Sequence, residues 1–197
     1  MKNTGIILIA AAMVSFASCK NADTSTTTGA SDSTAVLLKD KEVTPTEKKE
    51  TNWDKVDFTS PIVKYKEITS KYVDVRGSDA YSIYGVGEEV LFSSGKADIL
   101  PDAKACLGEV CSSIGQHYPS ANIRVYGYTD SKGSSADNKA LSMQRAVAVR
   151  NYLVSNCNIP ADNVVAVAEG ESRPVATNDN AQGRQENRRV QIVAMNK

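Results

Sequence analysis

The sequence has 197 residues, which suits one domain of ordinary size with accessory segments, at roughly 150 residues per domain. Lysine plus arginine and aspartate plus glutamate both number 23, so the chain has no net charge that would draw it to nucleic acid. The composition therefore argues against a nucleic-acid partner.

The N-terminus has the pattern of an export signal. Lys2 precedes the apolar run GIILIAAAMVSFAS, which is too short to favour a membrane span and ends in small residues directly before Cys19. This ending resembles a bacterial lipobox, in which the cysteine thiol receives diacylglycerol, although Phe16 stands where leucine is usual. We predict a lipoprotein signal over residues 1–18 and lipidation of Cys19. An ordinary signal peptide with an incidental cysteine is the alternative.

Residues 19–58 are expected to form a flexible tether behind this anchor. They are rich in Thr, Ser, Lys and Glu, and they contain few apolar side chains. Such a segment buries too little surface to offset the entropy lost on ordering. Trp53 and Phe58 lie near the end of this range, and we expect the ordered part to begin near them.

A β-hairpin is predicted next, within an N-terminal extension over residues 59–84. Two β-prone runs flank RGSDA, in which Gly77, Ser78 and Asp79 favour a turn. The following EEVLF, residues 88–92, is expected to be a strand.

Helices and strands then alternate. Pro101 and Asp102 open a helix. The strand NIRVYGY leads through the polar loop TDSKGSSAD into a second helix that ends near residue 155. The strand NVVAVAEG, a long polar loop over residues 171–187 and the strand RRVQIVAM complete the chain. The apolar stripes of the two helices are Ala103, Leu107, Val110, Cys111 and Ile114, and Ser142, Ala146, Val149 and Leu153. The order β-α-β-α-β-β predicts an α+β sandwich with helices on one face of a mixed sheet.

Three cysteines remain if Cys19 carries lipid, and an odd number cannot all pair within one exported chain. Cys106 and Cys111 lie five positions apart on one expected helix and point in different directions. We interpret them as small buried side chains. A disulfide from one of them to Cys157 is the alternative. His117 is the only histidine, so the sequence predicts no metal site, no cofactor and no enzymatic centre.

A series of short motifs spans residues 85–196. In chain order they are VLF (90–92), VYGYTDSKG (125–133), N-x-x-LS-x-x-RA-x-x-V-x-x-YL (138–153), GES-x-P (170–174), Asn178 and GR-x-x-NRRV (183–190). Together they resemble the OmpA-like C-terminal domain, which is shared by outer-membrane protein A, MotB-type stator proteins and peptidoglycan-associated lipoproteins. The lipobox and the tether make the layout most similar to the last of these. The resemblance implies a domain over residues 85–197.

That resemblance also implies non-covalent binding of peptidoglycan through the diaminopimelate of its peptide stem. By position in the motifs, Asp130 would bind the ammonium and Arg145 the carboxylate. Arg188 would be a further anion-facing arginine, Asn138 a polar site residue in the loop before the helix, and the amides from Thr129 onward backbone donors. A zwitterion requires such a pair, because a carboxylate only accepts hydrogen bonds and a guanidinium donates two in parallel. A purely structural Asp130–Arg145 ion pair is the alternative.

Three positions depart from the family pattern. Ser93 follows Phe92 where an acidic residue is usual, and Ala168 and Glu169 replace a glycine and an aromatic. Cys157 lies near the usual helix-stop glycine. The predicted function is that of an outer-membrane lipoprotein, facing the periplasm, that ties the membrane to the cell wall without catalysis. The alternative is an envelope lipoprotein with a degenerate wall site that binds another envelope protein.

Overall fold

The computed structural model describes residues 51–196, so the expected signal segment, Cys19 and most of the expected tether lie outside the described residues. Within the described part, none of the helices is both long enough and apolar enough to cross a membrane. The elements in chain order are η1 (Trp53–Lys55), β1 (Val73–Ser78), β2 (Tyr81–Gly87), α1 (Glu88–Leu91), α2 (Ala103–His117), β3 (Asn122–Tyr128), α3 (Ser135–Asn156), η2 (Ala161–Asn163), β4 (Val164–Gly170), α4 (Ala181–Asn187) and β5 (Arg189–Met195).

One five-stranded mixed sheet organises the chain, in the order β1-β2-β5-β3-β4. The hairpin β1–β2 is antiparallel, β5 runs antiparallel to both β2 and β3, and only β3 and β4 are parallel. The predicted hairpin and the α+β sandwich are therefore confirmed. The hairpin is a full part of the sheet, because β2 lies directly beside β5 and spans the boundary that we expected between residues 84 and 85.

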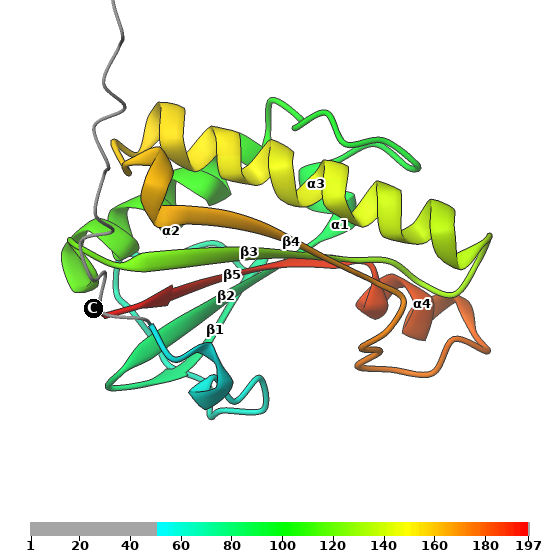
Figure 1. The fold of residues 1–197 in the computed structure, drawn as a ribbon, viewed down its shortest axis with the longest axis horizontal. Helices are drawn as coiled ribbons and strands as arrows, with labels where there is room; N and C mark the ends of the chain where they lie inside the picture. The colour runs from blue at the N-terminus through cyan, green and yellow to red at the C-terminus, as the bar shows by residue number, and fades with distance from the viewer. Residues whose placement is uncertain (1–50, 197) are drawn as a thin grey trace, which may run out of the picture. The chain divides into compact units, whose positions relative to one another are not determined.

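Helices α2 and α3 cover one face of the sheet, which we call the helix face (Figure 1). The predicted stripes of both helices point into this core, where Leu107, Val149 and Leu153 are fully buried. At Gly127 on β3 a Cβ would lie 2.1 Å from the carbonyl oxygen of Ser142, so only glycine lets α3 approach this strand so closely. The helix begins sharply because the Ser134 hydroxyl accepts a hydrogen bond from the Asp137 amide.

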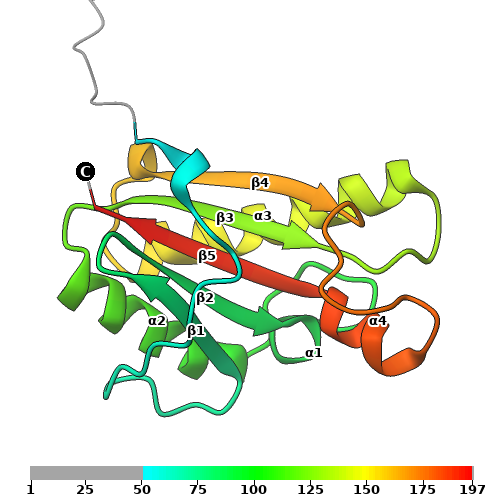
Figure 2. The same cartoon turned by 90° about the horizontal axis from the view of Figure 1, so that it is seen from below.

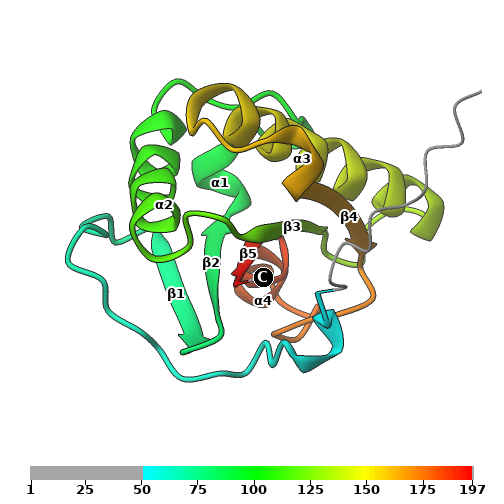
Figure 3. The same ribbon diagram turned by 60° about the vertical axis from the view of Figure 1, so that its left-hand side comes forward.

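The opposite face of the sheet is covered by the first residues that the structure describes (Figures 2 and 3). Its cluster of Tyr81, Ile83, Tyr126, Tyr128, Val193 and Met195 packs against Trp53, Val56 and Phe58. These three side chains belong to the ordered domain, as Trp53 and Phe58 were expected to do. Residues 53–58, which we assigned to the end of the tether, thus pack against the sheet.

Two local predictions were wrong. EEVLF, expected as a strand, forms the four-residue helix α1, and Phe92 makes only an isolated bridge with Ile99. The long polar loop contains a further helix, α4, which begins at Asn180 with a side-chain cap to the Gly183 amide. The short run of β-prone residues at its end made EEVLF look like a strand. The chain nevertheless passes from β2 at Gly87 directly into a helical turn.

Both edges of the sheet are occupied by other parts of the chain. On the β1 edge, the amide of Val63 donates to the Val75 carbonyl and the amide of Gly77 donates to the Pro61 carbonyl. On the β4 edge, the side chains of Lys139 and Arg150 from α3 donate to the carbonyls of Ala168 and Val164. Helix α3 thus supplies two donors to the otherwise open edge of β4.

The cysteines divide between the two interpretations. Cys106 is a free, buried thiol near the hydroxyl of Ser70, as expected for a small core side chain. Cys111 is bonded to Cys157, which was the alternative. Cys157 caps the C-terminus of α3, and Asn158, with φ of 55°, takes the left-handed conformation that glycine commonly adopts after a helix.

Candidate functional site

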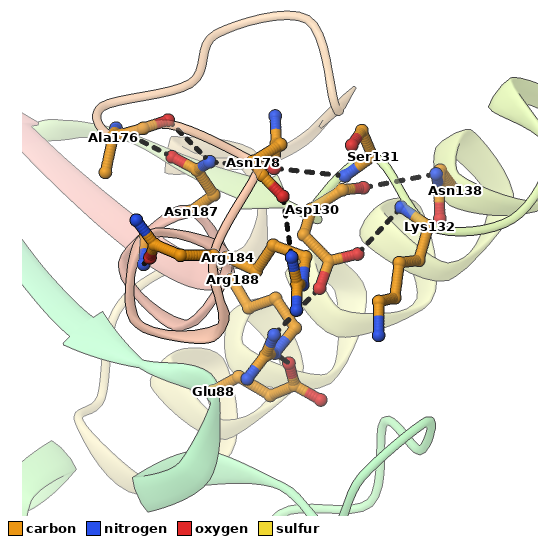
Figure 4. A network of polar contacts seen from close by, with 12 residues as sticks. Glu88, Asp130, Ser131, Lys132, Asn138, Ala176, Asn178, Arg184, Asn187 and Arg188 are labelled. Carbon is orange, nitrogen blue, oxygen red and sulfur yellow. Dashed lines mark hydrogen bonds and ion pairs between the residues drawn. The ribbon is translucent and has the colours of Figure 1, made fainter.

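The candidate site lies where three neighbouring strands end at one edge of the sheet. Strands β2 and β3 run in the same direction and β5 runs against both, so the end of β2, the end of β3 and the start of β5 meet. Glu88 directly follows β2, Asp130 comes two residues after β3, and Arg188 directly precedes β5. Arg145 reaches the same place from α3 (Figure 4 shows the first three).

These four side chains form an alternating chain of charges. Arg145 Nη2 lies 2.5 Å from Glu88 Oε1, Arg188 Nε lies 2.6 Å from Glu88 Oε2, and Arg188 Nη1 lies 2.7 Å from Asp130 Oδ2. The order is therefore Arg145, Glu88, Arg188, Asp130, with two positive and two negative groups. Each inner group has an opposite charge on either side, which is what buried charges require.

Asp130 is held ionised by its neighbours. Its Oδ1 accepts the Lys132 amide at 2.9 Å, and its Oδ2 accepts Arg188 Nη1. Burial raises the pKa of Asp130, but the Lys132 amide and the Arg188 guanidinium outweigh it and leave the pKa below its ordinary value. For Arg188, burial lowers the pKa, whereas Asp130 and Glu88 raise it by more. At neutral pH the exposed end of the charge chain is thus an anion beside a cation.

The two arginines differ in their access to solvent. The Arg145 side chain is 2 % exposed, and its Nε donates to the Lys96 carbonyl at 3.1 Å. The Arg188 side chain is 32 % exposed, and its Nη2 has no hydrogen-bond partner among residues 51–196. A ligand can therefore reach Arg188 without rearrangement, whereas Arg145 lies behind Glu88.

The direct ion pair between Asp130 and Arg145, which was the alternative, is not formed in the described structure, although both residues belong to one network. Arg145 is neutralised by Glu88, a residue that the sequence reading placed in a strand and gave no role. The misread strand explains the omission, because a helical turn at Glu88 is needed to direct its side chain into the network. The two buried acidic residues, Glu88 and Asp130, are therefore separated by Arg188.

Asn138 and Thr129 lie beside Asp130. Asn138, expected in the loop, lies in the first turn of α3, and its Nδ2 donates to the Asp130 carbonyl at 3.2 Å and to Glu171 Oε2 at 2.6 Å. Thr129 is 5 % exposed, and its hydroxyl is one of few buried polar groups without a partner in the described part of the chain. Such a hydroxyl is available to a ligand that reaches the strand end.

The expected backbone donors are mostly used within the protein. The Thr129 amide donates to the Gly170 carbonyl at 2.9 Å, the Ser131 amide to Asn178 Oδ1 at 3.3 Å and the Lys132 amide to Asp130. These bonds fix the loop after β3 rather than offer amides to a ligand.

The segment between β4 and β5 supports this loop from the other side. Asn187, which is 1 % exposed, accepts the amides of Val175 and Ala176 and donates to Asn178 Oδ1 at 2.9 Å. At Gly183 a Cβ would lie 2.1 Å from the Thr177 carbonyl oxygen. The motif GR-x-x-NRRV thus has three roles. Its glycine permits close packing, its asparagine holds the loop in place, and its first arginine after that asparagine enters the site.

The departures from the family pattern lie at the margin of the site. Ser93 is exposed and has no hydrogen bond to the four charged side chains in the described structure. Glu169 pairs with Arg173 at 3.6 Å, and the Ala168 carbonyl accepts Lys139. Within residues 51–196, no three His, Cys, Asp or Glu side chains are grouped so that they could hold a metal ion. The arrangement suits recognition of a ligand that carries both charges.

Comparison with known proteins gives the same assignment for this region. Residues 91–188 match the OmpA family. Outer membrane porin F of Pseudomonas aeruginosa is 40 % identical over 120 residues, which cover 60 % of this chain and 34 % of that protein. The peptidoglycan-binding protein ArfA of Mycobacterium tuberculosis is 36 % identical over 107 residues, which cover 54 % of this chain and 32 % of that protein. The chain thus spans about a third of the length of these relatives.

Among solved structures, the cell wall anchor of the T6SS from Pseudomonas aeruginosa has a similar fold. It superposes with a TM-score of 0.60 at 25 % identity, over 66 % of this chain and 92 % of that chain. The matched part includes most of the described domain.

Proposed function

Because the chain belongs to the OmpA family through residues 91–188, we propose that its domain binds peptidoglycan without catalysis and recognises the diaminopimelate of the peptide stem. The observation that carries the proposal is the alternating charge chain at the strand ends, with Asp130 and Arg188 at its accessible end. A relative named for peptidoglycan binding is 36 % identical to this chain.

The ligand end that fits is an amino acid with a free ammonium and a free carboxylate. Asp130 accepts from the ammonium, because its carboxylate is ionised and has further lone pairs beyond the two bonds that it accepts. The carboxylate binds the guanidinium of Arg188 and, behind it, that of Arg145. Thr129 supplies a free hydroxyl, and Asn138 holds the Asp130 backbone in place. Diaminopimelate offers both charges on one carbon, whereas lysine in the same stem position lacks the second carboxylate.

The same proposal places the protein in the cell envelope. The lipid carried by Cys19 would anchor the chain in the outer membrane, and the following tether would hold the domain in the periplasm. Support comes from the sequence motif before Cys19 and from a relative that is an outer-membrane protein.

Sedimentation with purified sacculi tests wall binding. The wild-type domain is expected to sediment with diaminopimelate-containing sacculi, and Asp130→Ala or Arg188→Ala to reduce binding by about 30-fold or more, because removing one partner of a desolvated pair costs about 2–5 kcal/mol. Asp102→Ala is the matched control, since Asp102 is exposed at the start of α2 and its side chain makes no capping bond.

Sacculi with lysine in place of diaminopimelate distinguish wall binding in general from recognition of diaminopimelate. Equal binding to both kinds of sacculi would contradict recognition of the second carboxylate but not wall binding. No sedimentation of the wild type with either kind, or unchanged binding of both site variants, would refute the proposed function at this site.

A further inference from the structure

Glu88 occupies a position in the charge chain that a ligand would be expected to use. Its carboxylate bridges two guanidinium groups, with Oε1 on Arg145 and Oε2 beside Arg188. The residue is 5 % exposed, and it is the only acidic residue in contact with Arg145 in the described structure. The proposed function places the carboxylate of the ligand in the same position, bound by the same two arginines.

Resting on that proposed function, we propose that Glu88 is an internal substitute for the ligand carboxylate. In the empty protein it neutralises Arg145 and Arg188, and on binding its side chain is displaced from Arg145, Arg188 or both by the ligand. Glu88 then sets the specificity of the site, because any incoming carboxylate has to compete with one that the chain already supplies.

The contact geometry supports a displaceable carboxylate. Glu88 Oε2 lies 2.6 Å from Nε of Arg188, whose side chain is 32 % exposed, so an incoming carboxylate can reach this contact from solvent. The backbone is fixed, because the Glu88 amide donates to the Arg188 carbonyl at 2.9 Å. Displacement therefore needs only rotation of the Glu88 side chain, at the start of a four-residue helix.

The exchange has a consequence for ligand choice. Replacing one carboxylate by another on the same arginines yields little net free energy. A ligand with only carboxylates therefore gains little, whereas one that also places an ammonium on Asp130 gains a contact that Glu88 cannot provide. The site should discriminate in favour of a zwitterion, although its arginines alone would bind any carboxylate.

Calorimetry with the whole domain and two matched ligands tests this inference. The ligands are meso-diaminopimelate and pimelate, which has the same carbon chain and carboxylates but no amino groups. The wild type is expected to bind diaminopimelate at least tenfold more tightly than pimelate. The variant Glu88→Gln keeps an oxygen for Arg145 but removes the charge. It is expected to bind both ligands about tenfold more tightly, an increase on the scale of one charge-assisted hydrogen bond.

Glu89→Gln is the matched control, since Glu89 is adjacent in sequence, exposed, and makes no ion pair with either arginine. Circular dichroism and thermal unfolding establish that each variant is folded at the temperature of the titration. Glu88→Asp, which keeps the charge but is too short to bridge both arginines, should give an intermediate affinity.

The outcomes separate this inference from the proposed function. Weaker binding of diaminopimelate by Glu88→Gln, as with Arg145→Ala, would overturn the substitution and make Glu88 a positioning residue. Unchanged binding would overturn it as well. If neither the wild type nor Glu88→Gln binds diaminopimelate and the wild type does not sediment with sacculi, the proposed function itself fails.

Discussion

Arg145 is the largest residue that is almost completely buried in the described fold. Because it is charged, its burial is stable only while other groups neutralise the charge and accept its hydrogen bonds. Its guanidinium lies 5.5 Å from the centre of the Phe92 ring and is bonded to the Glu88 carboxylate and the Lys96 carbonyl. These contacts tie α3 to the chain after β2. The residue thus contributes to the fold as well as to the proposed site, and its two roles can be separated by measurement.

At this scale we expect Arg145→Met to lower the free energy of unfolding by about 3–5 kcal/mol, because it leaves Glu88 buried with one partner fewer. Replacing both partners, in Glu88→Met with Arg145→Met, should recover part of the loss. Urea denaturation of the single and double variants measures both. The control is Arg173→Met, since Arg173 is exposed and its pair with Glu169 at 3.6 Å should contribute about 1 kcal/mol or less. A double variant as unstable as Arg145→Met would show that charge is not what the single change removes.

The elements were predictable where the pattern was long or the turn residues were specific. The stripes of α2 and α3 gave both helices, and Gly77 to Asp79 gave the hairpin. The short element at Glu88 was misread, because four residues carry no period that distinguishes a helical turn from a strand. That error hid the partner of Arg145. The family resemblance predicted that one site contains Asp130, Arg188 and Asn138. It did not predict which of them are in contact, because the contacts depend on how the strands are aligned in the sheet.

The disulfide provides a prediction for the elements. Cys111 on α2 and Cys157 at the end of α3 are 46 residues apart, and the closed loop contains β3 and all of α3. Replacing both by serine should lower the free energy of unfolding by about 2–4 kcal/mol, mainly because the unfolded chain regains freedom. Chemical denaturation in the presence and absence of a reductant measures the effect. Cys106→Ala is the control, and it should leave the response to the reductant unchanged. A wild type with no such response would contradict the prediction.

At the scale of the whole molecule, we propose that the expected anchor and the domain perform separate tasks. If residues 19–50 form the expected tether, their root-mean-square reach would be roughly 30 Å, which would hold the domain a short distance from a membrane. We expect Cys19→Ala to release the exported protein from the membrane fraction, because the acyl chains supply the membrane affinity. Fractionation of lysozyme-treated cells measures this, and the released protein should still sediment with sacculi. Membrane association that persists after wall digestion would contradict the lipid anchor.

The partly covered edges of the sheet have a consequence for crowded molecules. Strands with free amides and carbonyls invite neighbouring copies to add on, and that tendency grows with local concentration. Here Lys139 and Arg150 engage carbonyls along β4, while residues 61–63 lie along β1. Copies of the protein that gather densely on one surface would therefore be less inclined to pair through their strand edges. The site at the strand ends of each copy would stay accessible to its ligand.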